Sequence, residues 1–130
     1  MTKTEQVDAV TGAVRAILRT EGVAALAVAT GLYFTLGGSW WLFALLFFAP
    51  DLSFIGYAAG QRTGALIYNL AHTYVVPAVL GGMGLMIGSD LLQHLALIHA
   101  AHIGFDRAMG YGLKYPSGFK HSHLGVLGRG

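Results

Sequence analysis

Long apolar stretches are the feature of this sequence that most restricts its fold. A bilayer core of ~30 Å needs about 20 mainly apolar residues in one helix. Four consecutive segments approach this length, at about Thr20–Leu36, Trp40–Ala59, Thr63–Ile87 and Leu91–Met109. The chain is 55% hydrophobic and 11% charged, whereas soluble domains carry about 25% charged residues. A small soluble domain has too much surface to bury so many apolar side chains, so the sequence predicts an integral membrane protein.

Short, glycine-containing connections separate the four segments, at Gly37–Ser39, Gly60–Arg62 and Gly88–Asp90. Tight turns of this kind make neighbouring helices antiparallel. The predicted fold class is therefore all-α, a four-helix transmembrane bundle covering residues 20–109. An amphipathic arm, residues 1–19, is expected at the cytoplasmic interface, and residues 110–130 are expected to form a basic, aromatic cytoplasmic tail.

The basic residues predict the orientation in the membrane. The Gly37–Ser39 and Gly88–Asp90 connections contain no Lys or Arg. All eight basic residues thus fall on one side of the four-helix arrangement, which predicts that both termini are cytoplasmic. They form no basic stripe interleaved with aromatic residues, so nucleic acid is not an expected partner. No signal peptide is recognised, and the absence of cysteine excludes disulfides.

Two glycine pairs have the GxxxG spacing that lets helices approach closely in lipid: Gly56 with Gly60, and Gly84 with Gly88. We expect these glycines at helix contacts. Three phenylalanines of the second segment are expected to face lipid or to fill the core: Phe43, Phe47 and Phe48.

Ionisable side chains within the apolar segments need a reason, because an Asp at a helix centre costs ~2.5–3.5 kcal/mol on insertion scales. Asp51, His72 and His102 lie on three different helices at one depth, ~10–14 Å from the cytoplasmic helix ends at about 1.5 Å per residue. Asp106 is four residues after His102 and shares its helix face. The sequence therefore predicts one polar layer in the cytoplasmic half of the bundle.

Two prolines lie close to this layer. Pro50 is expected to free the carbonyl of Leu46, and Pro77 is expected to free that of Thr73. Broken backbone is tolerated in a membrane where other groups satisfy it. The prolines therefore favour a polar or hydrated pocket.

Carboxylates and imidazoles from several helices are the ingredients of a metal site. The predicted ligands suit zinc, iron or manganese: Asp51, His72, His102 and Asp106. Two other interpretations stay open, a metal-free hydrogen-bonded cluster that holds the helices in register and a pathway for protons or a ligand.

Other polar residues are assigned supporting roles. Glu21 is expected to meet Asp106 or Arg107 and to act as a general base or to orient a histidine. Tyr68 and Asn69 share the face of His72, and Arg107 and Lys114 are placed to hold an anionic headgroup. The remaining histidines are interpreted as ordinary polar or solvated residues: His94, His99, His121 and His123.

Three stretches resemble a family of small bacterial membrane proteins known only as domain of unknown function 4260: GGSWWLFALLFFAPDLSFIGY, GALIYNLAHTYVVP and AHIGFDRAMGYGLKYPSGFKHSHLG. The resemblance covers about Leu18–Gly125. It implies a compact helical domain, in the bacterial inner membrane, and brings no known reaction. It draws attention to a set of polar positions: Glu21, Asp51, Asn69, His72, His102, Asp106 and Lys114. At His121 the family favours an acidic residue, so a role for the tail is not implied.

The chain is also similar in chemistry to membrane hydrolases of the ceramidase and progestin-receptor type, which place Asp and His ligands for zinc near one leaflet but have about seven helices and another motif order. The leading hypothesis is a metal-dependent hydrolase, with Asp51 and Glu21 as catalytic residues, that acts on a lipid or other amphiphile. A bound metal lowers the pKa of its water toward ~7. The alternatives are an accessory, scaffold or ligand-binding subunit of a larger membrane complex, and a proton-coupled carrier, which needs at least a dimer.

Overall fold

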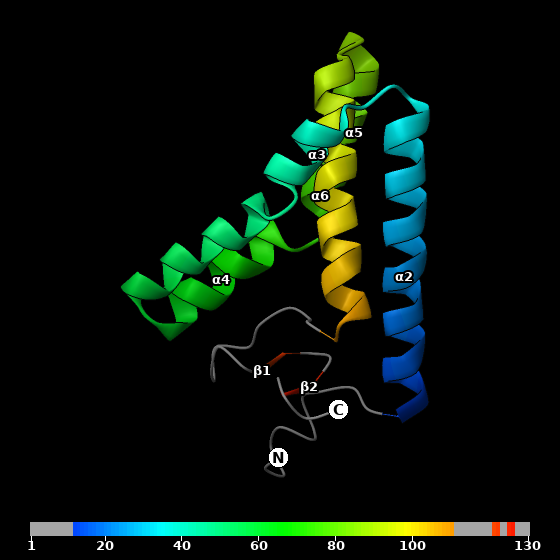
Figure 1. The fold of residues 1–130 in the computed structure, drawn as a ribbon. Helices are drawn as coiled ribbons and strands as arrows, with labels where there is room; N and C mark the ends of the chain where they lie inside the picture. The colour runs from blue at the N-terminus through cyan, green and yellow to red at the C-terminus, as the bar shows by residue number, and fades with distance from the viewer. Residues whose placement is uncertain (1–11, 111–120, 123–124, 127–130) are drawn as a thin grey trace.

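A computed structural model describes residues 12–110, 121–122 and 125–126 of the chain (Figure 1). The helices are α2 (Gly12–Thr35), α3 (Trp40–Leu46), the 3₁₀ helix η1 (Ala49–Ala59), α4 (Gln61–Ala71), α5 (Val75–Ile87) and α6 (Asp90–Ala108). Two short strands, β1 (His121–Ser122) and β2 (Gly125–Val126), pair antiparallel after the helices. The predicted all-α class, with four helical segments, is confirmed.

The first helix is longer than predicted. Helix α2 begins at Gly12, whereas the sequence analysis placed a separate arm up to residue 19. Residues 12–19 therefore continue directly into the first apolar segment, and residues 1–11 lie outside the described part of the chain.

Two of the four segments are interrupted near their prolines. The second segment divides into α3 and η1, and Pro50 lies in the first positions of η1. The third divides into α4 and α5, with Pro77 in the first turn of α5. Proline has no N–H to donate, and it is tolerated in the first turn of a helix, where that N–H would have no helical partner. The breaks lie just before these first turns and leave non-helical backbone at Phe48, three residues before Asp51, and at His72.

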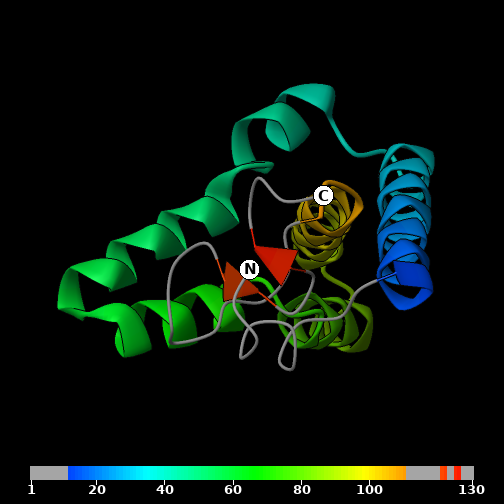
Figure 2. The same cartoon turned by 90° about the horizontal axis from the view of Figure 1, so that it is seen from below.

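Helix α6 is the centre of the fold. It packs against α2 along one side and against α5 along another, while η1 and α4 form a hairpin that leaves this group at an angle (Figures 1 and 2). The buried residues of α6 are Ala96, Ile98, Ala101, His102, Ile103, Gly104 and Asp106. This helix therefore presents its polar side chains to other helices.

Three helical stretches of the described chain are long and apolar enough to cross a membrane: Gly12–Thr35, Trp40–Ala59 and Gln61–Ile87. This is consistent with the predicted integral membrane protein. The fourth predicted span, which corresponds to α6, is not among them. Its histidines and Asp106 lower its hydropathy, and its polar face is covered by neighbouring helices.

The GxxxG prediction is half correct. A Cβ atom added to Gly56 would lie 2.9 Å from the Cβ of Ile67, and one added to Gly84 would lie 2.9 Å from the backbone nitrogen of Gln93, so both glycines are at helix contacts. Gly60 and Gly88 instead have φ values of 116° and 69° and nothing within 4 Å of an added Cβ. They serve the turns, where a positive φ favours glycine.

The close crossing of α2 and α6 was not predicted. A Cβ added to Gly104 of α6 would lie 2.6 Å from the nitrogen of Leu26 and 2.7 Å from the carbonyl oxygen of Gly22, both in α2. Gly104 belongs to a row of small residues at four-residue spacing on α6, with Ala100 and Ala108 on either side, but the predicted pairs considered glycines alone. Gly22 has leucine at both positions four residues away, so no repeat marks it. Arg19 adds a hydrogen bond at the same end of the interface, from its Nε to the carbonyl oxygen of Ala108 at 2.9 Å.

Candidate metal centre

Four side chains meet where the η1–α4 hairpin joins α6. Asp51 lies in the first turn of η1, and His72 is the residue that ends α4. His102 and Asp106 lie one turn apart on α6. We call these four residues the Asp/His cluster. They are the four residues that the sequence predicts as metal ligands, and the structure brings their side chains together.

The donor atoms of the cluster lie close to one another. Nε2 of His72 is 3.2 Å from Oδ1 of Asp51, 3.2 Å from Nε2 of His102 and 3.4 Å from Oδ2 of Asp106. Nε2 of His102 is 3.2 Å from Oδ1 of Asp51 and 3.1 Å from Oδ2 of Asp106. One donor atom from each residue lies within 4.8 Å of the other three.

Burial is unequal within the cluster. His72, His102 and Asp106 are 2%, 0% and 7% exposed. The side chain of Asp51 is 33% exposed. The cluster therefore has one accessible side, at Asp51.

These distances are close to those between the donors of a metal site. Four donors at ~2.0–2.1 Å from a tetrahedral zinc lie ~3.3–3.4 Å apart, and five of the six separations in the cluster are 3.1–3.4 Å. One carboxylate oxygen of Asp51 and one of Asp106 complete the set and lie within 4.8 Å of each other. Two imidazole nitrogens facing each other at 3.2 Å need either a proton or a cation between their lone pairs. The donor types and their proximity are therefore compatible with a divalent metal.

Backbone contacts orient His72. Its Nδ1 donates to the carbonyl oxygen of Tyr68 at 2.9 Å, because a carbonyl can only accept. In neutral His72 this places the free lone pair on Nε2, which faces the cluster. The ring of Tyr68 stacks on His72 with 3.8 Å between centroids and 11° between planes. A metal-binding histidine usually donates a hydrogen bond from the ring nitrogen that does not bind the metal, as Nδ1 of His72 does here.

His102 is held by aromatic rings. Phe47 and Phe48 meet it edge-on, with centroids at 5.4 Å and 6.1 Å. The carbonyl of Phe47 lies beside the ring, but the contact does not reach hydrogen-bond geometry, so Nδ1 of His102 is buried without a partner among the described residues. Within that part of the chain, the second nitrogen of His102 has weaker support than that of His72.

Two residues of α6 contact the break between α4 and α5. Nε2 of His99 donates to the carbonyl oxygen of Ala71, and Nη2 of Arg107 donates to that of His72 at 3.1 Å. His99 had been interpreted as an ordinary polar residue. It instead satisfies backbone that the break exposes.

The other predicted residues are not part of the cluster. Glu21 is exposed, and within the described residues it forms no ion pair with Arg107, so the expected contact is wrong. Asn69 is half-buried on α4, one turn before His72. Lys114 and His123 lie outside the described residues, and His121 is placed only as part of β1.

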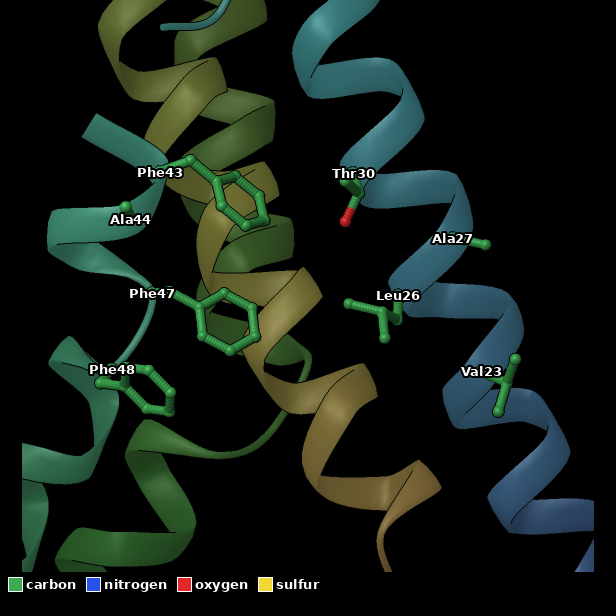
Figure 3. Close-up of a pocket in the computed structure, with 8 residues that line it drawn as sticks. All are labelled: Val23, Leu26, Ala27, Thr30, Phe43, Ala44, Phe47 and Phe48. Carbon is green, nitrogen blue, oxygen red and sulfur yellow. The ribbon is translucent and has the colours of Figure 1, made fainter. Parts of the chain in front are cut away.

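An apolar pocket of about 660 Å³ lies beside the cluster, between α2 and the α3 region (Figure 3). Figure 3 shows Phe47 and Leu26 facing each other across it. Its lining residues are Val23, Leu26, Ala27, Thr30, Phe43, Ala44, Phe47 and Phe48. The ring of Phe47, which also contacts His102, separates the pocket from the cluster. The three phenylalanines thus line a pocket.

A family model described as Domain of unknown function (DUF4260) matches residues 15–127, a span that includes the whole Asp/His cluster. No curated protein and no solved structure matches the chain.

Proposed function

Because this chain belongs to the family described as Domain of unknown function (DUF4260), which names no activity, we propose a function from the Asp/His cluster itself. The protein binds a divalent metal ion within an integral membrane helical domain. The observation that carries this proposal is the approach of four donor atoms from three helical segments, with five of their separations between 3.1 and 3.4 Å.

Zinc is the metal that the cluster fits best. Two imidazole nitrogens and two carboxylate oxygens match its usual ligands and its usual coordination number of four. Iron and manganese are bound by the same donor types, but they favour higher coordination numbers with open positions. The metal is also expected to offset the cost of placing two carboxylates in an apolar domain, because each carboxylate then has a permanent opposite charge beside it.

The proposed activity is hydrolysis of a lipid or other amphiphile. A catalytic zinc site keeps three protein ligands and one exchangeable position. His72, His102 and Asp106 are buried, whereas Asp51 is partly exposed. We therefore expect Asp51 to be the ligand that leaves the metal when water occupies the exchangeable position. A bound divalent metal lowers the pKa of its water toward ~7, and Asp51 is the carboxylate placed to accept a proton. The pocket behind Phe47 suits the apolar chain of such a substrate.

One observation favours a second function, without catalysis. The cluster lies at the junction between the η1–α4 hairpin and the α2–α5–α6 group, which otherwise contact each other little. Four protein ligands close a zinc site, as in structural centres. In that case the metal stabilises a scaffold, accessory or ligand-binding subunit of a homo-oligomer or larger complex in the bacterial inner membrane.

Elemental analysis of detergent-purified protein tests the proposal. We expect about one zinc, iron or manganese ion per chain, its loss in His102→Ala, and its retention in His94→Ala, because His94 contacts the carbonyl of Leu36 away from the cluster. Wild-type protein that is free of metal, and that takes up none when titrated with zinc, would refute it.

Asp51→Asn separates the two functions. Retained metal with lost cleavage of ester or amide amphiphiles supports the hydrolase. Loss of metal together with a lower unfolding temperature, in a protein that cleaves no such amphiphile, supports the structural centre.

A further inference from the structure

The break between α4 and α5 leaves two consecutive carbonyl groups without helical donors. The N–H of Val75, which would serve Ala71 in a continuous helix, donates to Oγ1 of Thr73 at 3.4 Å. Among the described residues, no backbone N–H donates to the carbonyl of Ala71 or to that of His72. Unsatisfied carbonyls cost several kcal/mol in a membrane, so this break needs donors from elsewhere.

Helix α6 supplies both donors. His99 serves the carbonyl of Ala71, and Arg107 serves that of His72. The guanidinium of Arg107 also lies 6.0 Å from the ring centre of Tyr74, within the range of a cation–π contact. The break is thus attached to α6 through two consecutive peptide units, the one between Ala71 and His72 and the one between His72 and Thr73.

We propose that His99 and Arg107 are positioning residues for the metal ligand His72. The inference rests on the proposed metal centre and adds two residues to it. Helix α6 carries His102 and Asp106, and His99 and Arg107 lie three residues before the first and one residue after the second. One helix therefore holds two ligands directly and sets the backbone of the third.

These two hydrogen bonds affect the orientation of the His72 ring. Its Nδ1 is bonded to Tyr68 within its own segment, so the ring moves with the backbone of the break. If the break shifts relative to α6, the 3.2 Å separation between the Nε2 atoms of His72 and His102 is lost. Removing either donor should therefore distort or weaken the metal centre without removing a ligand.

Cobalt(II) binding tests this in the full chain, because its visible absorption reports coordination geometry and its affinity is measured by competition with a chelator. We expect His99→Ala and Arg107→Ala to weaken cobalt binding about 10–100-fold, the usual effect of removing a group that supports a ligand, and to change the spectrum. His99→Gln, which keeps an N–H donor, should recover most of the affinity.

His94→Ala is the matched control. His94 lies on the same helix and its Nε2 contacts the carbonyl oxygen of Leu36 at 3.3 Å, so the change removes a similar bond far from the cluster. We expect wild-type affinity and spectrum. Should the alanine variants not elute as monodisperse protein, His99→Asn, whose shorter amide does not span the gap, is compared with His99→Gln, and only the second should keep the affinity.

Variants that unfold at lower temperature but keep the cobalt affinity and spectrum of the wild type would overturn the inference, because His99 and Arg107 would then only stabilise the fold. Equal affinity of His99→Asn and His99→Gln would do the same. Failure of the wild-type protein to bind cobalt or zinc is a separate result, which refutes the metal centre and the inference with it.

Discussion

Replacing Gly104 with alanine should destabilise the protein, because a methyl group has no room where α6 crosses α2. The new Cβ would lie 2.6 Å from the nitrogen of Leu26 and 2.7 Å from the carbonyl oxygen of Gly22, while ordinary contacts begin at 3.4 Å. Both neighbours are backbone atoms, so no rotamer change relieves the overlap. The two helices must separate by about 0.8 Å, in an interior that is otherwise close-packed.

Two opposing effects set the size of the change. Overpacking of this kind costs about 1–3 kcal/mol. Alanine in place of glycine within a helix stabilises the folded state by about 0.5–1 kcal/mol, because alanine loses less backbone conformational entropy than glycine on folding. We therefore expect Gly104→Ala to lower the free energy of unfolding by about 1 kcal/mol, within a range of about 0–2.5 kcal/mol.

Gly31→Ala is the control, since Gly31 also lies within a helix and nothing is within 4 Å of its added Cβ. It should be neutral or stabilising by about 0.5–1 kcal/mol. Reversible unfolding in mixed detergent micelles, followed by circular dichroism, gives both values on one scale. Gly104→Ala that is as stable as Gly31→Ala would refute the close crossing of α2 and α6.

Two further predictions follow from the turns and the charge pattern. Tyr33→Phe should lower the free energy of unfolding by about 1 kcal/mol in the same assay. The buried Tyr33 hydroxyl donates to the carbonyl oxygen of Ser39 at 2.6 Å and closes the turn between α2 and α3. An unchanged free energy of unfolding would count against that bond. Reporter fusions after residue 130 and in the Gly60–Arg62 connection should read cytoplasmic, and a fusion at Gly37–Ser39 should read external, whereas an external C-terminus would contradict the topology.

The sequence alone predicted the helical class and the members of the cluster. Apolar length marks the helical segments, because the bilayer imposes a minimum span. The cost of a buried charge makes Asp51, His72, His102 and Asp106 conspicuous in such segments, and counting residues along each helix places three of them at one depth. Both arguments need only composition and distance along the chain.

Contacts between helices were decided by the tertiary structure. Rotation of each helix about its axis is set by packing, which hydropathy does not report in a lipid environment, where apolar side chains are tolerated on every face. The sequence therefore did not reveal that Glu21 is exposed, that His99 and Arg107 satisfy the break, or that Gly104 meets Gly22. The angle of the η1–α4 hairpin was equally hidden, because a proline marks where a helix breaks but not the direction in which the chain continues.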